Sequence, residues 1–118
     1  MNTDNGIVHK LPFREEHRRT FERIKSGEKN IETRAGNPEY LRIREGDSIE
    51  FSCGEDKAVK QVRKVSHYKD LDVLFAAYPP QTINPELASV EEAKERYLSF
   101  PGYEQRIKEY GILVFELE

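Results

Sequence analysis

The fold of this chain is decided in the stretch Gly27-Glu28-Lys29-Asn30-Ile31-Glu32-Thr33-Arg34. A helical pattern ends at its glycine, and a strand pattern begins directly after it. Because side chains alternate along a strand, Lys29, Ile31 and Thr33 are expected on one face, with Ile31 in a core and Lys29 at its rim. Glu32 and Arg34 then share the opposite face, close enough to pair or to hold a polar ligand together. A surface ion-pair cluster is the alternative interpretation.

The segments around this stretch predict short helices and strands. Upstream, an apolar stripe over residues 13–24 indicates a helix from Arg14 to Ser26 that Gly27 caps. Downstream, the alternation over 48–52 indicates a half-buried strand, which a hairpin turn joins to a second strand over 58–66. The rest of the chain is predicted as a short helix from Asp70 to Pro79, a loop over 81–87, a helix opened by the capping box Ser89-Val90-Glu91-Glu92, a helical segment over 103–110 and a final strand over 112–117.

Composition limits the possible classes of protein. The chain has 118 residues, a charged fraction of 35% and a net charge of −3. Residues 1–69 hold 15 Lys/Arg against 12 Asp/Glu, whereas residues 70–118 hold 4 against 10. A protein that is acidic overall is a poor candidate for tight binding to nucleic acid through a broad basic surface, although a local basic site in the first half is compatible with this distribution.

The sequence gives no sign of a membrane span, a cofactor or a metal site. No apolar run approaches the roughly 20 residues that a transmembrane helix needs, and the N-terminus lacks the apolar stretch of a signal peptide. We therefore predict a cytoplasmic protein. Cys53 is the single cysteine, and the three histidines have no metal-ligand spacing. No pattern in the sequence predicts an oligomeric state.

The order of the predicted elements favours an α+β fold. The predicted order is one helix, three strands, two helices and one strand. This order lacks the regular strand–helix alternation of a parallel α/β protein, and it indicates a small mixed β-barrel or rolled sheet with peripheral helices. We expect a flexible N-terminus over residues 1–12 and a single domain over residues 13–118.

Several motifs in this order resemble the ASCH domain (activating-signal-cointegrator homology domain). They are Gly27-x-Lys29-x-x-Glu32-x-Arg34, Arg44-Glu45-Gly46-Asp47, the strand around Ile49-Glu50-Phe51, the segment Val62 to Tyr68, the helix opened by Ser89, and the closing Tyr110-Gly111-Ile112-Leu113-Val114. The resemblance covers roughly residues 13–118. It implies a PUA-like β-barrel, a fold found in RNA-binding proteins and RNA-modifying enzymes.

The resemblance also implies candidate catalytic residues. Some small bacterial members hydrolyse N4-acetylcytidine with a lysine and a threonine of a Gly-x-Lys-Thr-Ile-Thr-x-Arg motif and with a later glutamate. Here Lys29 matches the lysine, Glu32 occupies the threonine position, and Glu86 is the candidate for the later glutamate. A carboxylate can act as a general base but repels a developing oxyanion, so Glu32 does not reproduce the role of the threonine.

The leading hypothesis is that the protein binds RNA or a nucleotide-like ligand in a cleft around the Gly27–Arg34 stretch. Candidate ligand-binding residues are Arg34, Arg44, Tyr40 and Thr82, which offer guanidinium groups for phosphate, a ring for stacking and a hydroxyl. Each has a structural alternative in ion pairing, solvent exposure or packing. The alternative functions are a hydrolase of a modified nucleoside or small amide and a non-catalytic interaction module.

Overall fold

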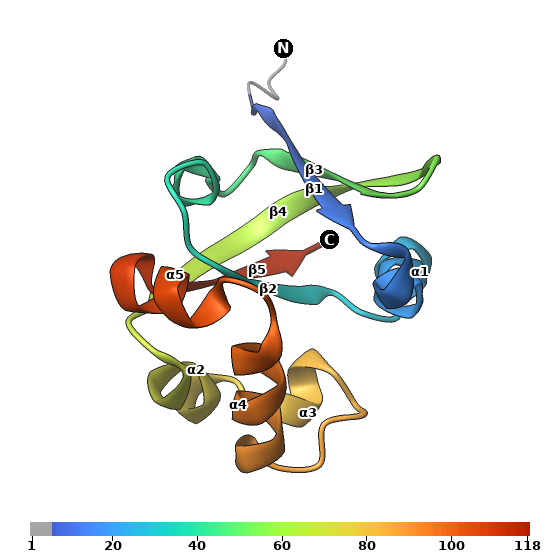
Figure 1. The fold of residues 1–118 in the computed structure, drawn as a ribbon. Helices are drawn as coiled ribbons and strands as arrows, with labels where there is room; N and C mark the ends of the chain where they lie inside the picture. Colours follow the sequence, from blue (N-terminus) through green and yellow to red (C-terminus); the bar gives the residue numbers. More distant parts are fainter. Residues whose placement is uncertain (1–5) are drawn as a thin grey trace. The chain divides into compact units, whose positions relative to one another are not determined.

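The computed structural model describes residues 6–118, which form a mixed set of helices and strands (Figure 1). The strands are β1 (Val8–Phe13), β2 (Ile31–Ala35), β3 (Ser48–Cys53), β4 (Asp56–Tyr68) and β5 (Ile112–Leu117). The helices are α1 (Arg18–Ser26), α2 (Leu71–Ala77), α3 (Pro80–Ile83), α4 (Val90–Ser99) and α5 (Tyr103–Tyr110), with 3-10 turns η1 (Glu15–His17) and η2 (Tyr40–Arg42). Within this part of the chain, no helix is both long and apolar enough to cross a membrane.

The five strands form one sheet in the order β1-β3-β4-β5-β2. β1 runs parallel to β3, and β3 runs antiparallel to β4, so the sheet is mixed. Two compact units make up the chain. The first comprises the chain up to Glu32, Ile43–Val65 and Phe115–Glu118, and the second comprises Thr33–Arg42 and Ser66–Val114. Helices inserted into a mixed sheet confirm the predicted α+β class.

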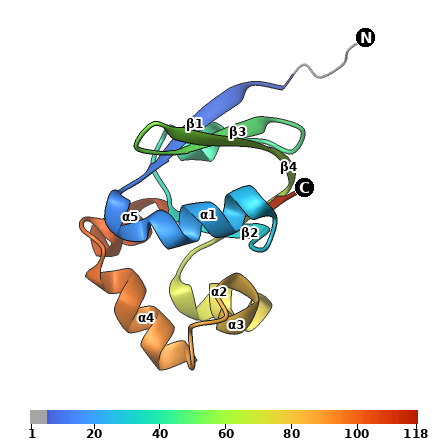
Figure 2. The ribbon, with the colours of Figure 1, turned by 90° about the vertical axis from the view of Figure 1, so that its right-hand side faces the viewer.

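The core of the first unit follows the predicted alternation. Along β3, Ile49, Phe51 and Cys53 are buried and the intervening residues are partly exposed. The predicted helix is present as α1, although it begins at Arg18 and not at Arg14, because residues 15–17 form the 3-10 turn η1. α1 contacts β3 and buries Phe21 and Ile24 (Figure 2). It ends at Gly27, whose φ of 88° is the left-handed conformation that a helix-capping glycine supplies.

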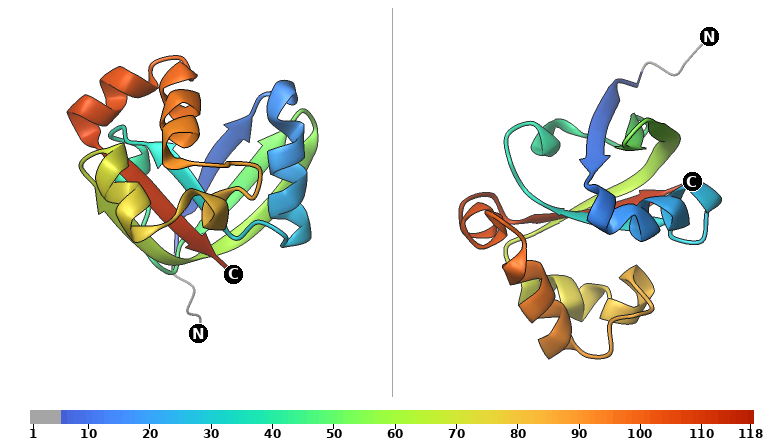
Figure 3. Two further views of the ribbon diagram at one scale, coloured as in Figure 1. Left: turned by 90° about the horizontal axis from the view of Figure 1, so that it is seen from below. Right: turned by 45° about the vertical axis from the view of Figure 1, so that its right-hand side comes forward.

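The second unit contains the remaining helices, and their ends follow the sequence signals (Figure 3). The Asp70 carboxylate accepts a hydrogen bond from Val73 N at the start of α2. The predicted capping box opens α4, because Ser89 Oγ accepts from Glu92 N and Glu92 Oε1 accepts from Ala88 N. The segment predicted as a loop over 81–87 differs, since α3 begins at Pro80 and runs to Ile83. Proline suits this first helical position because its fixed φ is already helical.

The N-terminal prediction needs a correction. Residues 8–12, expected to belong to a flexible N-terminus over 1–12, form most of β1, in which Leu11 is fully buried. Asp47 stabilises the start of this strand, since its carboxylate accepts a hydrogen bond from Ile7 N at 3.2 Å and contacts His9 Nε2 at 2.8 Å. A single buried position and a proline within six residues leave too weak a pattern to indicate a strand. Residues 1–5 lie outside the described part of the chain.

Candidate functional site

Lys29 is a buried lysine whose position differs from the predicted one. β2 begins only at Ile31, because the backbone at Lys29 still bonds to the preceding helix, with Lys29 N donating to Arg23 O at 2.8 Å. The side chain reaches forward along the chain, so that Nζ donates to Ile31 O at 2.6 Å and lies 3.7 Å from Glu32 Oε1. The expectation that Lys29 and Glu32 occupy opposite faces is therefore wrong, since strand alternation does not apply before Ile31.

The Lys29–Glu32 pair is withdrawn from water. Only 8% of the lysine side chain and 6% of the glutamate side chain are exposed. Taking two charges out of water costs several kcal/mol for each, and mutual attraction repays this cost only in part. Buried charges of this kind are uncommon without a functional or a specificity role, so this pair is the strongest candidate for a functional site in the first unit.

Arg44, also in the first unit, has an exposed side chain, and its backbone N donates to Asp47 Oδ2 at 3.0 Å. Burial raises the pKa of Asp47, but the hydrogen bonds from His9 and from the backbone amides of Arg44 and Ile7 outweigh it and leave the pKa below its ordinary value. Asp47 is therefore a structural carboxylate, and the Arg44 backbone belongs to the same turn. Arg44 is exposed, as a ligand-binding role requires.

The other predicted residues lie in the second unit. Arg34 is half-buried in β2, while Thr82 and Glu86 are exposed, with Thr82 Oγ1 donating to Pro79 O at 2.6 Å. Tyr40 is half-buried, and the Arg106 guanidinium lies 5.7 Å from its ring centroid. One face of the Tyr40 ring is therefore occupied by a cation.

Two features of the second unit were not predicted from the sequence. Thr33 Oγ1 and Tyr97 Oη form a buried hydrogen bond of 2.6 Å. Arg106 of α5 donates from Nη2 to Ala35 O at 2.6 Å and from Nε to Gly36 O at 3.2 Å. These two hydrogen bonds connect α5 to the backbone at the end of β2. Sequence patterns identify polar residues on apolar helix faces, but they do not pair residues that are 64 or 71 positions apart.

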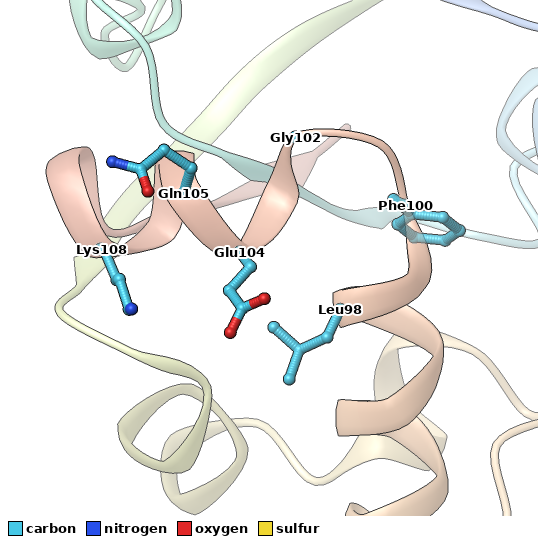
Figure 4. Close-up of a pocket in the computed structure, with 6 residues that line it drawn as sticks. All are labelled: Leu98, Phe100, Gly102, Glu104, Gln105 and Lys108. Atoms are coloured by element: carbon cyan, nitrogen blue, oxygen red, sulfur yellow. The ribbon is translucent and has the colours of Figure 1, made fainter.

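A surface pocket of about 380 Å³ also belongs to the second unit (Figure 4). It is lined by Leu98, Phe100, Gly102, Glu104, Gln105 and Lys108. None of the predicted site residues lines it. Glu104 and Lys108 project from the same side of α5, so opposite charges lie at its edge. Among residues 6–118, no three or more His, Cys, Asp and Glu side chains are grouped as a metal site requires.

Comparison with known proteins identifies structural relatives and a family. No curated protein matches the chain. The crystal structure of hypothetical protein PH0355 is similar, with a TM-score of 0.78 and 28% identity over 95% of this chain and 98% of that one. The solution NMR structure of Protein PF0455 from Pyrococcus furiosus has a TM-score of 0.71 and 27% identity over 95% and 96% of the two chains. These relatives confirm the predicted PUA-like fold. The ASCH domain model matches residues 17–118, and the chain therefore belongs to the ASCH domain family.

Proposed function

We propose that this protein binds RNA or a nucleotide-like ligand at a site that contains Lys29 and Glu32. The observation that carries the proposal is the buried ion pair of these two residues, 3.7 Å apart within one of the motifs on which the family resemblance rests. Family membership adds to the argument, because ASCH domains commonly bind RNA.

The two side chains offer complementary groups to a nucleotide. The Lys29 ammonium donates hydrogen bonds to a phosphate or to the carbonyl of a base. The Glu32 carboxylate accepts hydrogen bonds from an exocyclic amine or a ring N–H, as acidic side chains do with cytosine. A ligand that carries both hydrogen-bond donors and acceptors can replace part of the attraction within the ion pair by hydrogen bonds to the two side chains. A nucleobase carries both kinds of group and a simple anion carries only acceptors, so the pair favours a nucleobase.

The remaining candidates are proposed individually, Arg44 in the first unit and Arg34, Tyr40 and Thr82 in the second. We assign phosphate binding to Arg34 and Arg44, base stacking to Tyr40 and a hydroxyl contact to Thr82. These four assignments rest on the chemistry of the side chains, and each is tested by substitution against the same ligand. Replacing Tyr40 by Leu removes stacking and keeps bulk, which makes it the most informative of the four.

A hydrolase of a modified nucleoside or small amide is the second candidate function. The observation that favours it is the burial of the Glu32 carboxylate beside an ammonium group, an arrangement that suits a general base and an oxyanion donor. Glu32 would take a proton from water, the resulting hydroxide would attack the amide carbonyl, and Lys29 would donate to the oxyanion. When the oxyanion collapses and the C–N bond breaks, Glu32 would return its proton to the departing nitrogen, so that an amine and a carboxylic acid are released. Glu86, in the second unit, is the other carboxylate that the family resemblance offers as a base.

The test is calorimetric titration of the purified protein with each of the four ribonucleoside 5′-monophosphates. The variant is Lys29→Met together with Glu32→Gln, which removes both charges and leaves neither one buried alone. We expect its affinity to fall by roughly 10- to 150-fold, the loss of one charged hydrogen bond of about 1.5–3 kcal/mol. Lys25→Met, at an exposed lysine of α1, is the control and should bind as the wild type does.

The same preparations distinguish the two candidate functions. Incubation with N4-acetylcytidine that releases cytidine, and does so only when Lys29 and Glu32 are intact, would establish the hydrolase. Binding of nucleotides without any turnover would support the binding function. If no nucleotide binds and no cytidine forms in a folded sample, the ion pair is structural and the proposal is wrong.

A further inference from the structure

Arg106 connects three segments of the second unit. It lies in α5, and its guanidinium donates to Ala35 O at 2.6 Å and to Gly36 O at 3.2 Å, where β2 ends. The central carbon of the guanidinium also lies 5.7 Å from the ring centroid of Tyr40 in η2 and 5.3 Å from that of Tyr103 in α5. These distances are within the roughly 6 Å over which a cation is attracted to an aromatic ring. All five residues belong to the second unit.

Backbone contacts fix the guanidinium of Arg106 independently of Tyr40. Ala35 is fully buried, and Gly36 N donates to Gly111 O at 2.8 Å, so both carbonyls belong to backbone that is itself held in place. Arg106 uses two of the five N–H donors of its guanidinium on these carbonyls. The side chain is therefore a fixed support for whatever packs against it.

The Tyr40 ring depends on this guanidinium for its position. The backbone of Tyr40 is held, because Tyr40 N donates to Asn37 Oδ1 at 2.6 Å, but this contact does not fix the ring. In the described part of the chain, no aromatic ring and no second cation lies against the Tyr40 ring. The Tyr103 ring, by contrast, also contacts the rings of Phe100 and Tyr97, at centroid distances of 5.1 and 6.5 Å. Loss of the guanidinium should therefore leave Tyr40 mobile and Tyr103 in place.

We propose that Tyr40 and Arg106 form a platform on which a nucleobase stacks, with Arg106 as its positioning residue, an inference that rests on the proposed function. The guanidinium covers one face of the half-buried Tyr40 ring, and the opposite face is the one that a base would contact. A ring that is held in place before binding loses less conformational freedom when the base stacks on it. Removing Arg106 should therefore weaken stacking although Arg106 does not touch the base.

The ligand group that this platform recognises is a base and not a phosphate. Two N–H donors of Arg106 are occupied by backbone carbonyls, and the guanidinium lies against two aromatic rings. Residues 70–118, which include α5, hold 4 Lys/Arg against 10 Asp/Glu, so the net charge of this part of the chain does not favour an anion. Every nucleobase has a π face, so stacking here should tolerate all four bases.

The experiment is a double-mutant cycle measured by calorimetric titration with AMP. Tyr40→Leu removes the stacking ring and should weaken binding by about 5- to 160-fold. Arg106→Met removes the guanidinium and should weaken binding by about 2- to 13-fold, the effect of having to order one side chain on binding. The double variant should bind as Tyr40→Leu alone does, because a positioning residue acts only through the ring that it holds. Lys108→Met, at an exposed cation of the same helix, is the control and should bind as the wild type does.

A second measurement tests the platform without a ligand. The chain has no tryptophan, so Tyr40→Trp supplies a single fluorescent reporter at the ring position. Adding Arg106→Met to this variant should raise the constant for quenching by acrylamide, because the ring face that the guanidinium covered becomes accessible. Adding Lys108→Met instead should leave the quenching constant unchanged.

The outcomes separate this inference from the proposed function. Weaker AMP binding in both single variants, no additional loss in the double variant and increased quenching support the inference. An additional loss in the double variant would overturn it, because Arg106 would then contact the ligand directly. Unchanged AMP binding by folded Arg106→Met would also overturn it, as would equal weakening of ribose 5-phosphate, which has no base to stack. A wild type that binds no nucleotide is instead a failure of the proposed function, and unchanged quenching would show separately that Arg106 does not hold the ring.

Discussion

A thermodynamic cycle on Lys29 and Glu32 tests the energetic reasoning behind the site. Each single change, Lys29→Met or Glu32→Gln, removes one member of a pair whose side chains are 8% and 6% exposed. The charge that stays behind is buried without this partner, and such losses cost about 3–5 kcal/mol. For a chain of 118 residues, with about 2.1 cal/mol/K of unfolding entropy per residue, this corresponds to a decrease in Tm of roughly 12–20 °C.

The double variant should be more stable than the sum of the single losses predicts. The coupling free energy follows from the separation of 3.7 Å between Nζ and Oε1. Coulomb's law gives about 1 kcal/mol at the dielectric constant of water and about 4 kcal/mol at an effective value of 20, so we expect a coupling between these limits. Urea unfolding of the four proteins, followed by circular dichroism, measures it.

The ion pair of Lys94 and Asp72 provides the control cycle. Its N–O distance of 2.8 Å is shorter, but its side chains are 38% and 72% exposed, so we expect a coupling of at most about 1 kcal/mol. The burial of the side chains, and not the N–O distance, should therefore decide which pair has the larger coupling free energy. A coupling at Lys29–Glu32 equal to or smaller than the one at Lys94–Asp72 would refute the reasoning that desolvation makes this pair exceptional.

Three further changes are predicted from single contacts. Asp47→Asn should destabilise the protein near pH 7 by about 1–3 kcal/mol. Because the pKa of Asp47 is lowered in the folded state, its stabilising effect is complete above the unfolded pKa of about 3.9, and stability measured between pH 2 and 5 should fall less steeply in the variant. Tyr97→Phe should cost about 1–3 kcal/mol in urea unfolding by leaving the Thr33 hydroxyl buried, and adding Thr33→Val should recover most of it. Gly111→Ala should lower Tm more than Gly27→Ala does, since a Cβ at Gly111 would collide with a backbone carbonyl while a Cβ at Gly27 would meet open space.

Local signals in the sequence predicted the elements well, because those signals act within a few residues. The glycine at the end of α1, the capping box at Ser89 and the alternation along β3 each appear in the structure as expected. Pairings between residues that are far apart in the sequence were harder to predict. β1 is a strand because it pairs with β3, 40 residues later, and because Asp47 holds its start. A pattern within six residues carries none of this information.

The candidate site was predicted in its residues but not in its geometry. Lys29 and Glu32 were identified from their position in the stretch that follows Gly27, yet their contact depends on where the strand begins. A strand starting at Lys29 would separate the two side chains, whereas the observed start at Ile31 lets the lysine side chain reach along the chain to Glu32. Because strand boundaries are the least certain part of a sequence-based prediction, side-chain contacts at such a boundary can be assigned only from a structure.

The position of the threonine in β2 bears on the choice between binding and hydrolysis. The amidohydrolase form of the motif has a hydroxyl where this chain has Glu32, and the nearest hydroxyl is that of Thr33. One position along a strand reverses the face of a side chain, so Thr33 points away from the face that Glu32 occupies. Its hydroxyl is moreover buried in a hydrogen bond of 2.6 Å with Tyr97. Thr33 therefore does not replace the motif threonine, and a hydrolase built on this stretch would have to use carboxylate chemistry, while nucleotide binding needs only the ammonium and the carboxylate that are present.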